Sequence, residues 1–539
     1  MTGRAASALR AAVYVAGGGL GGVSAAGALA ERGWSVIMTE PTDWIGGQLT
    51  SQLVPLDEHR HIERTGANAS YRRLRDGIRD YYRRHFPLTE AARHDPYLNP
   101  GHAWVSPVSA DPRVGVAVLE AMLAPHLASG RITLLRRHEP VAVHVAGDRV
   151  AGVQVRDRES GDLREIEAAF VLDATELGDL LPLAGVEHVS GREARAQTGE
   201  PSAPETADPT DMQAVTWCFA VEHLEGEDHT IDRPATYDFY RTWEPEPWHG
   251  GRILDFGGPA EHRGPRRRYT LTINPKDAEI DLDHRNMGPT PELWTYRRIA
   301  AREMFRDGAF RSDITVVNWP MNDYVGGPLF GVPDAQSRWE GARQLSLSLL
   351  YWLQTEAPRP DGGVGWPGLR LRADVAGTSD GLAKMPYVRE SRRIAARRTI
   401  VEQDVDRAFR DGRGAERYPD SVGVGHYFWI DRHASTGGRT GSGGLPEPFE
   451  IPLAALVPVR VRNLLPAAKN IGTTQITNGC YRLHPVEWSI GEAAGTLAAY
   501  CLGTDTEPHQ VSETPSHIAA LQRDLVSAGA QLHWAGETW

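Results

Sequence analysis

Lysine is nearly absent from this chain of 539 residues, since Lys276, Lys384 and Lys469 are the only three and arginine supplies the other basic residues. Acidic residues outnumber basic ones by 70 to 58, which gives a formal net charge of −12. A phosphate backbone repels a chain of this charge, so we expect no nucleic-acid partner. Because arginine is spread along the whole chain, an arginine cluster alone says little about function.

Cysteine is also scarce: Cys218, Cys480 and Cys501 lie far apart and form no C-x-x-C pair. This excludes a redox mechanism based on two neighbouring thiols and is typical of a reduced, cytoplasmic setting. The histidines lack H-E-x-x-H or comparable spacing, and G-x-S-x-G is absent, so we predict neither a metal site nor a serine hydrolase. The apolar run at 11–30 is rich in glycine, which fits a nucleotide-binding turn better than a membrane span.

The glycines of that run, Gly17, Gly19 and Gly22, follow the G-x-G-x-x-G pattern, with Leu20 inside it. In such a turn one glycine allows the bend, one lets the backbone approach a pyrophosphate, and one allows close packing of helix and strand. The small residues at 23–31 predict a helix whose positive end faces the phosphates.

Two predicted strands flank this turn and helix, at 12–16 and 34–39, and the second leads directly to Glu40. An acidic side chain at this distance from the turn accepts hydrogen bonds from an adenosine ribose. The strand-turn-helix-strand pattern therefore predicts a dinucleotide site.

The chain continues with Gly46-Gly47-Gln48-Leu49-Thr50-Ser51-Gln52. A Gly-Gly pair just past the ribose acid is not needed for NAD, but an FAD site uses it where the chain doubles back along the cofactor. On these residues the chain resembles the FAD-dependent oxidoreductases of the glutathione-reductase-like superfamily, in the branch that carries the Gly-Gly-Gln-Leu-Thr-Ser-Gln stretch.

The resemblance implies FAD as the cofactor and a site completed by later segments. The residues that it assigns to FAD beyond the glycine turn and Glu40 are Gly46, Gly47, Gln48, Thr175, Asn470, Pro485 and Glu487. One position departs from the pattern, because Glu176 stands where an Ala-Thr-Gly ending is more usual.

We therefore predict an α/β fold: a doubly wound, Rossmann-like FAD-binding domain built from discontinuous segments, with an inserted mixed α/β substrate domain. The predicted divisions are 10–190 and 385–505 for the FAD-binding domain, 191–384 for the substrate domain and 506–539 for a C-terminal helix and tail. Further helices are expected at about 71–84, 112–127, 393–409, 485–501 and 516–527.

A second G-x-G-x-x-G after a strand is missing, so a dedicated NAD(P)H domain is not expected. We interpret the protein as a dehydrogenase or oxidase in which a small organic substrate gives a hydride to flavin N5. The electron acceptor stays open between dioxygen and a carrier. Three alternatives stay open as well: a flavin-dependent C=C reductase or desaturase, an NAD(P)H-using monooxygenase, and a flavin-bearing binding or regulatory module.

Hydride loss from a C–H beside oxygen or nitrogen requires a base near the substrate proton. The candidates are His59, His426 and His484, which lie in segments expected near the flavin, and His59 could instead carry a covalent flavin bond. Arg389 and Tyr427 are the candidate substrate contacts. Lys469 could stabilise a reduced, anionic flavin.

Overall fold

The computed structural model describes residues 8–260, 267–276, 291–440 and 443–534. Its largest sheet has the order β3-β2-β1-β6-β5-β4, and β17 pairs with β6 outside this path. In that order, and with β17 last, the strands are Ile132–Arg136, Val36–Glu40, Leu9–Ala16, Leu163–Asp173, Arg149–Asp157, His138–Ala146 and Leu464–Pro466. β1, β2, β3, β6 and β17 run parallel, whereas β4 and β5 form an antiparallel extension. The predicted α/β class with a Rossmann-like sheet is confirmed.

The first strand-turn-helix unit is built as its sequence predicts. β1 ends in four buried residues, 13–16, and α1 (Leu20–Glu31) follows after the glycine turn. All but two residues of α1 are buried, because its alanines and glycines let the helix approach its neighbours closely.

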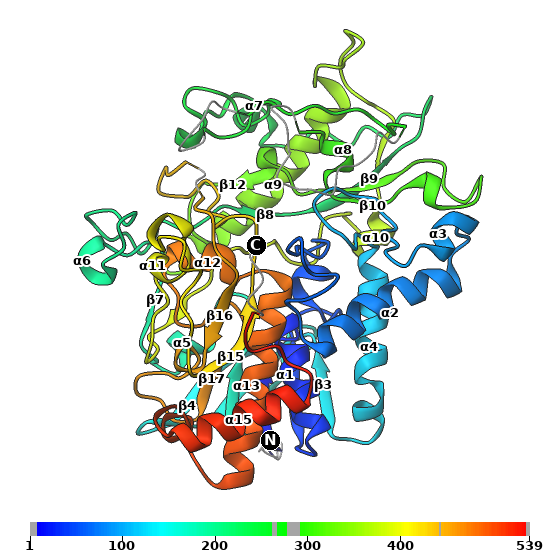
Figure 1. The fold of residues 1–539 in the computed structure, drawn as a ribbon. Helices are drawn as coiled ribbons and strands as arrows, with labels where there is room; N and C mark the ends of the chain where they lie inside the picture. Colours follow the sequence, from blue (N-terminus) through cyan, green and yellow to red (C-terminus); the bar gives the residue numbers. More distant parts are fainter. Residues whose placement is uncertain (1–7, 261–266, 277–290, 441–442, 535–539) are drawn as a thin grey trace, which may run out of the picture.

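Helix α13 (His484–Thr504) lies beside α1 in the lower half of Figure 1. A Cβ atom on Gly491 would come within 2.0 Å of the Gly21 carbonyl oxygen, and one on Gly495 within 2.6 Å of the Ala25 carbonyl oxygen. The two helices therefore approach backbone to backbone, and this contact brings the start of α13 to the glycine turn.

Residues 191–384 supply a second, antiparallel sheet of order β10-β11-β9-β13, in the upper part of Figure 1. Its strands are Arg298–Ala300, Ile314–Val317, Phe219–His223 and Leu369–Leu371. The long helix α9 (Ala335–Thr355) belongs to the same part of the chain and buries Leu345, Leu349 and Leu353. A short pair, β8 (Val215–Thr216) with β12 (Asp323–Tyr324), lies close to it.

The remaining elements include most of the predicted helices. The larger ones are α2 (Ala69–His85), α4 (Pro112–Ala128), α12 (Gln475–Tyr481) and α15 (Pro515–Ser527), with the hairpin of β15 (Ser421–Gly425) and β16 (Phe449–Pro452) between them in sequence. The short helices are α3 (Glu90–His94), α5 (Leu180–Leu183), α6 (Arg195–Thr198), α7 (Tyr237–Thr242), α8 (Leu293–Tyr296), α10 (Ala373–Ala376) and α14 (Pro508–Glu513). Among the described residues no helix is long and apolar enough to cross a membrane.

The predicted helix at 393–409 is wrong. The segment contains β14 (Arg393–Ile394, paired with β7, His188–Val189), the single turn α11 (Glu402–Val405) and the 3-10 turn η5 (Arg407–Phe409). Its amides donate to carbonyls of other segments, as in Ile394 to Asn470 and Ile400 to Gly472. These long-range backbone hydrogen bonds replace the helical ones that the local sequence favours.

Candidate functional site

A cavity of about 490 Å³ opens where β1, β2 and β6 end. Gly17 and Gly19 after β1, Glu40 at the end of β2, and Thr175 after β6 all line it. In a parallel sheet with this strand order, ligands bind outside the carboxyl ends of the strands. The cavity therefore lies where the sequence predicts a dinucleotide.

The glycine turn has the conformation that this site needs. Gly17 has φ +98°, and a Cβ atom there would lie 2.3 Å from the Ala174 carbonyl oxygen. Gly47 has φ +51°, and its Cβ would lie 2.9 Å from the Cα of Gly19. A side chain at either position would displace backbone, so the open space beside the turn depends on glycine.

Charged side chains surround the start of α1. Lys469, fully buried, forms an ion pair with Glu176, and Gln48 donates to Glu487. The amide of Gly21 lies 3.4 Å from Oε1 of Glu487. Burial works against charge on Lys469, but Glu176 and Glu487 outweigh it and raise the pKa of the ammonium. A buried cation beside the N-terminus of α1 suits a diphosphate, and Glu176 occupies space in the same place.

Glu40 is held by its own turn. Its carboxylate accepts hydrogen bonds from the Gly18 amide at 3.1 Å, the Thr42 amide at 2.9 Å and the Thr42 hydroxyl at 2.7 Å. Burial raises the pKa of Glu40 to about 7, because desolvation outweighs these hydrogen bonds. A ribose hydroxyl in the cavity would supply a further donor to the carboxylate.

Four other predicted cofactor residues, one of which (Thr175) lines the cavity, hold the surrounding elements in place. Asn470 donates to the Asp173 carbonyl at 3.0 Å, and Thr175 donates to the Asp173 carboxylate at 2.7 Å. Pro485 occupies the first turn of α13, and Leu20 begins α1. Together they fix the ends of β6, β17 and the two helices around the cavity. The glycine turn, the helix amides, Glu40 and the buried cation fit the ADP half of a flavin dinucleotide.

A second cavity, of about 330 Å³, adjoins the first. Met385, Pro386 and Val388 line the first cavity, and the next residue, Arg389, lines the second. The amide of Tyr387 donates to the Thr216 carbonyl, so the segment is extended and neighbouring residues face opposite sides. Aromatic side chains make up much of the second cavity's wall: Trp104, Tyr269, Tyr296, Trp319, Tyr427, Phe428 and Trp429.

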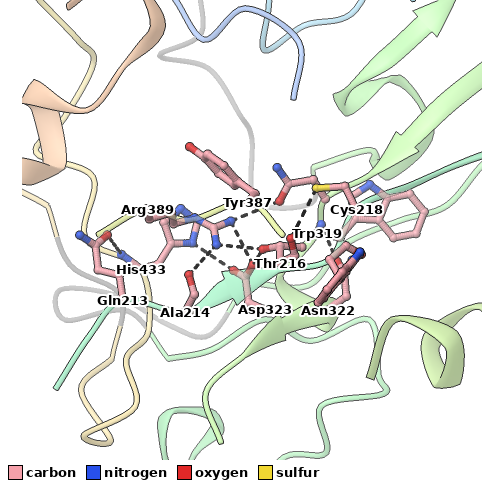
Figure 2. A network of polar contacts seen from close by, with 12 residues as sticks. Gln213, Ala214, Thr216, Cys218, Trp319, Asn322, Asp323, Tyr387, Arg389 and His433 are labelled. Atoms are coloured by element: carbon pink, nitrogen blue, oxygen red, sulfur yellow. Dashed lines mark hydrogen bonds and ion pairs between the residues drawn. The ribbon is translucent and has the colours of Figure 1, made fainter. Parts of the chain in front are cut away.

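His433, which sequence reasoning missed, stands between two carboxylates in this second cavity. Nδ1 lies 3.0 Å from Oδ2 of Asp323, and Nε2 lies 3.2 Å from Oδ2 of Asp431. Figure 2 shows His433, Asp323 and Arg389 meeting in one polar network. Burial alone would raise the pKa of Asp323, but Arg389, His433 and Thr216 lower it to about 2. His433 and Arg482 likewise hold the pKa of Asp431 below its ordinary value against burial.

Both predicted substrate residues line the second cavity. Arg389 pairs with Asp323 at 3.0 Å and donates to the Ala214 carbonyl and the Thr216 hydroxyl. The hydroxyl of Tyr427 donates to Asp57 at 3.3 Å. Most of the guanidinium of Arg389 is thus engaged by the protein itself.

His484 is not among the residues that line the second cavity, but Asp57 links it to Arg297 and Tyr427, which do line it. Its Nδ1 accepts the Asp57 amide at 2.9 Å, and the Asp57 carboxylate pairs with Arg297 at 3.0 Å. Burial lowers the pKa of His484 to about 4, although Asp57 favours the charged ring. Because Nδ1 is an acceptor, the neutral ring carries its proton on Nε2, which makes no regular hydrogen bond.

His59 and His426 come together elsewhere, and neither lines either of these cavities. Their ring centroids are 5.8 Å apart, with His61 and Trp534 against them. Burial lowers the pKa of His59 to about 3 and that of His426 well below its ordinary value. Both rings are therefore neutral near pH 7, and their catalytic role stays a prediction.

The fold and the first cavity define a dinucleotide-binding protein. The family described as FAD dependent oxidoreductase matches residues 12–525, and the chain belongs to this family. FAD is the cofactor that the family implies, and the protein is a flavin-dependent oxidoreductase. No curated protein sequence matches the chain.

Similar solved structures include the flavin-dependent monooxygenase PieE in complex with FAD and substrate, at 16% identity and a TM-score of 0.25. The myxobacterial chondrochloren halogenase CndH has 19% identity and a TM-score of 0.22, and L-proline dehydrogenase from P. horikoshii has 15% and 0.18. The matches cover 40, 41 and 34% of this chain and span 35, 46 and 24% of those chains, respectively.

Proposed function

We propose that the protein is a dehydrogenase or oxidase whose small organic substrate binds in the second cavity. One observation carries this proposal: the second cavity adjoins the dinucleotide cavity across 385–389 and contains His433 between Asp323 and Asp431. When bound, FAD supplies a two-electron acceptor for a hydride from a substrate C–H.

The chain's own part is to hold the substrate and take up a proton. Oxidation of a C–H beside O–H or N–H to C=O or C=N releases one hydride and one proton. We assign that proton to the cluster of His433 and its two aspartates. Its carboxylates, which Arg389 and Arg482 keep ionised, are the proton acceptors, and the two imidazole nitrogens lie within hydrogen-bond distance of them and position them as donors.

The domain divisions 10–190, 191–384, 385–505 and 506–539 are part of the proposal. The return of β17 to the main sheet supports joining the first and third segments. The separate sheet of 191–384, with Asn318, Trp319 and Asp323 in the second cavity, supports a substrate role for the second segment.

The test is anaerobic reduction of the flavin, which is measured as the loss of its absorption at ~450 nm. A metabolite that bleaches the flavin identifies the substrate, and we expect NADH and NADPH to bleach it only slowly. His433→Asn should slow bleaching by ~10²–10⁴ with the flavin still bound. His94→Asn, on an exposed histidine of α3, is the matched control. Variants of His59, His426 and His484 belong in the same series.

Rapid bleaching by NADPH alone would contradict the proposal and favour the reductase or monooxygenase alternative. Full activity of His433→Asn, combined with a slow His484 or His426 variant, would instead indicate that the base is one of the histidines predicted from the sequence.

A further inference from the structure

The arginines of the second cavity outnumber its carboxylates. Its wall contains Arg267, Arg297, Arg389 and Arg432 but only two acidic residues, Asp323 and Asp431. Both aspartates already have partners, in Arg389 and Arg482 as well as His433. The wall therefore has more positive charge than its own acids neutralise.

Arg432 is the cation that this arrangement leaves without a carboxylate. Its side chain makes no hydrogen bond and no ion pair among the described residues, and its Nε is buried without a partner. Burial, then the nearby Arg439, lowers the pKa of Arg432 to about 10, while Glu402, Glu200 and Asp406 attract it only from a distance. Asp211 lies 3.9 Å from Arg439 and offsets that charge, so Arg432 is the member of the pair that has no carboxylate beside it. A half-buried cation in this position is costly without an anion.

The buried polar side-chain atoms of the wall that have no partner among the described residues are all nitrogens. Buried nitrogens that donate without finding an acceptor occur on five lining residues: Arg297 (Nε and Nη1), Asn318, Trp319, Arg389 and Arg432. No lining residue has a buried side-chain oxygen without a partner within the described chain. Buried donors are normally paired in native proteins, so their accumulation here calls for a ligand rich in acceptors.

The proposal that follows rests on the proposed function, since it names the class of substrate for the same cavity. We propose that the substrate is an organic acid that contains a ring. Arg432 and Arg297 bind its carboxylate, and the ring lies against the aromatic wall. Arg297 is only 6% exposed and is tied to Asp57 through Nη2, so its other donors are held in place. A carboxylate supplies both the negative charge that Arg432 lacks and the acceptors that the wall lacks.

Binding of non-reducing probes tests this without any turnover. We would titrate the flavin-loaded protein calorimetrically with benzoate and glucuronate, each beside its uncharged counterpart, benzamide and glucose. The carboxylates should bind at least about 10-fold more tightly than the neutral molecules, as expected for one charge-assisted hydrogen bond.

Arg432→Gln should remove most of that difference and Arg432→Lys should keep much of it, because lysine retains the charge. Arg297→Lys is a second variant, which keeps the pair with Asp57. It should weaken the binding of the two carboxylates and leave the binding of the neutral molecules unchanged. Arg84→Gln removes the same charge from the surface of α2 and should change nothing. Thermal unfolding of each variant shows whether it is folded.

Equal binding of the charged and neutral members of each pair would overturn the proposal, as would carboxylate binding that Arg432→Gln leaves unchanged, or no carboxylate binding at millimolar concentration. Carboxylate binding lost in Arg432→Gln, combined with a flavin that no organic acid reduces, would support the anion site and contradict the dehydrogenase function.

Discussion

Replacing Glu40 by glutamine should abolish a pH dependence of FAD binding. Burial holds the pKa of Glu40 near 7 in the protein without FAD, so at pH 6 most molecules carry a protonated side chain there. Ribose hydroxyls that donate to Glu40 favour the carboxylate and lower its pKa. FAD binding through Glu40 therefore releases a proton, and the affinity rises with pH until about 7 and then levels off.

The magnitude follows from the size of the shift. One released proton changes the affinity by at most ~10-fold per pH unit, or ~1.4 kcal/mol, so binding at pH 6 should be up to ~10-fold weaker than at pH 8. The pKa in the unfolded chain is about 4.5, lower than in the folded chain. Stability from this group is thus fully present below pH 4.5 and is lost as pH rises to 7, by about 3 kcal/mol in the protein without FAD.

The assay is calorimetric titration of the FAD-free protein at pH 6, 7 and 8, in buffers of different ionisation enthalpy that report the protons released. Wild type should release more protons than Glu40→Gln at pH 6, and the two should converge at pH 8. Other titrating groups near the site, such as Glu487, are common to both proteins and cancel in the difference. Identical proton release and identical pH profiles would show that Glu40 does not contact FAD.

Further predictions concern the surroundings of that site. Gly17→Ala should prevent FAD retention, measured as flavin per protein after purification, because the new methyl group meets backbone and the φ is positive. Lys469→Met should weaken FAD by ~10-fold or more in fluorescence titration, since it leaves Glu176 unpaired beside the diphosphate position. Gly491→Val should lower the unfolding temperature by several degrees, because its Cβ would lie 2.0 Å from the Gly21 carbonyl oxygen.

The parts of the fold that could be predicted from sequence are those set by neighbouring residues. The turn at Gly17, the helix after it and the strand that ends at Glu40 are adjacent in the chain, and each has a local pattern. The segment 393–409 shows the limit of such patterns. Its residues favour a helix, but its amides find carbonyls in segments such as Gly472, which no local pattern reveals.

His433 was missed for a similar reason. Its partners are Asp431, two residues away, and Asp323, which is 110 residues away and belongs to β12. A histidine between two aspartates has no fixed spacing when the fold brings them together. The only signal in the sequence is the close spacing of Asp431 and His433. Two such residues two positions apart cannot be distinguished from those of an ordinary loop.

His484 shows that a motif can predict the position of a residue without predicting its chemical role. The motif placed this histidine at the start of the helix that meets the glycine turn, and the structure agrees. Its role, however, depends on which nitrogen carries the proton, and that is decided by the amide of Asp57. With Nδ1 occupied, the neutral ring at pH 7 is a donor through Nε2 and not a base. A proton acceptor is therefore to be sought in the cavity beyond Asp57, among the carboxylates of Asp323 and Asp431 that flank His433, while His484 is suited to donate a hydrogen bond.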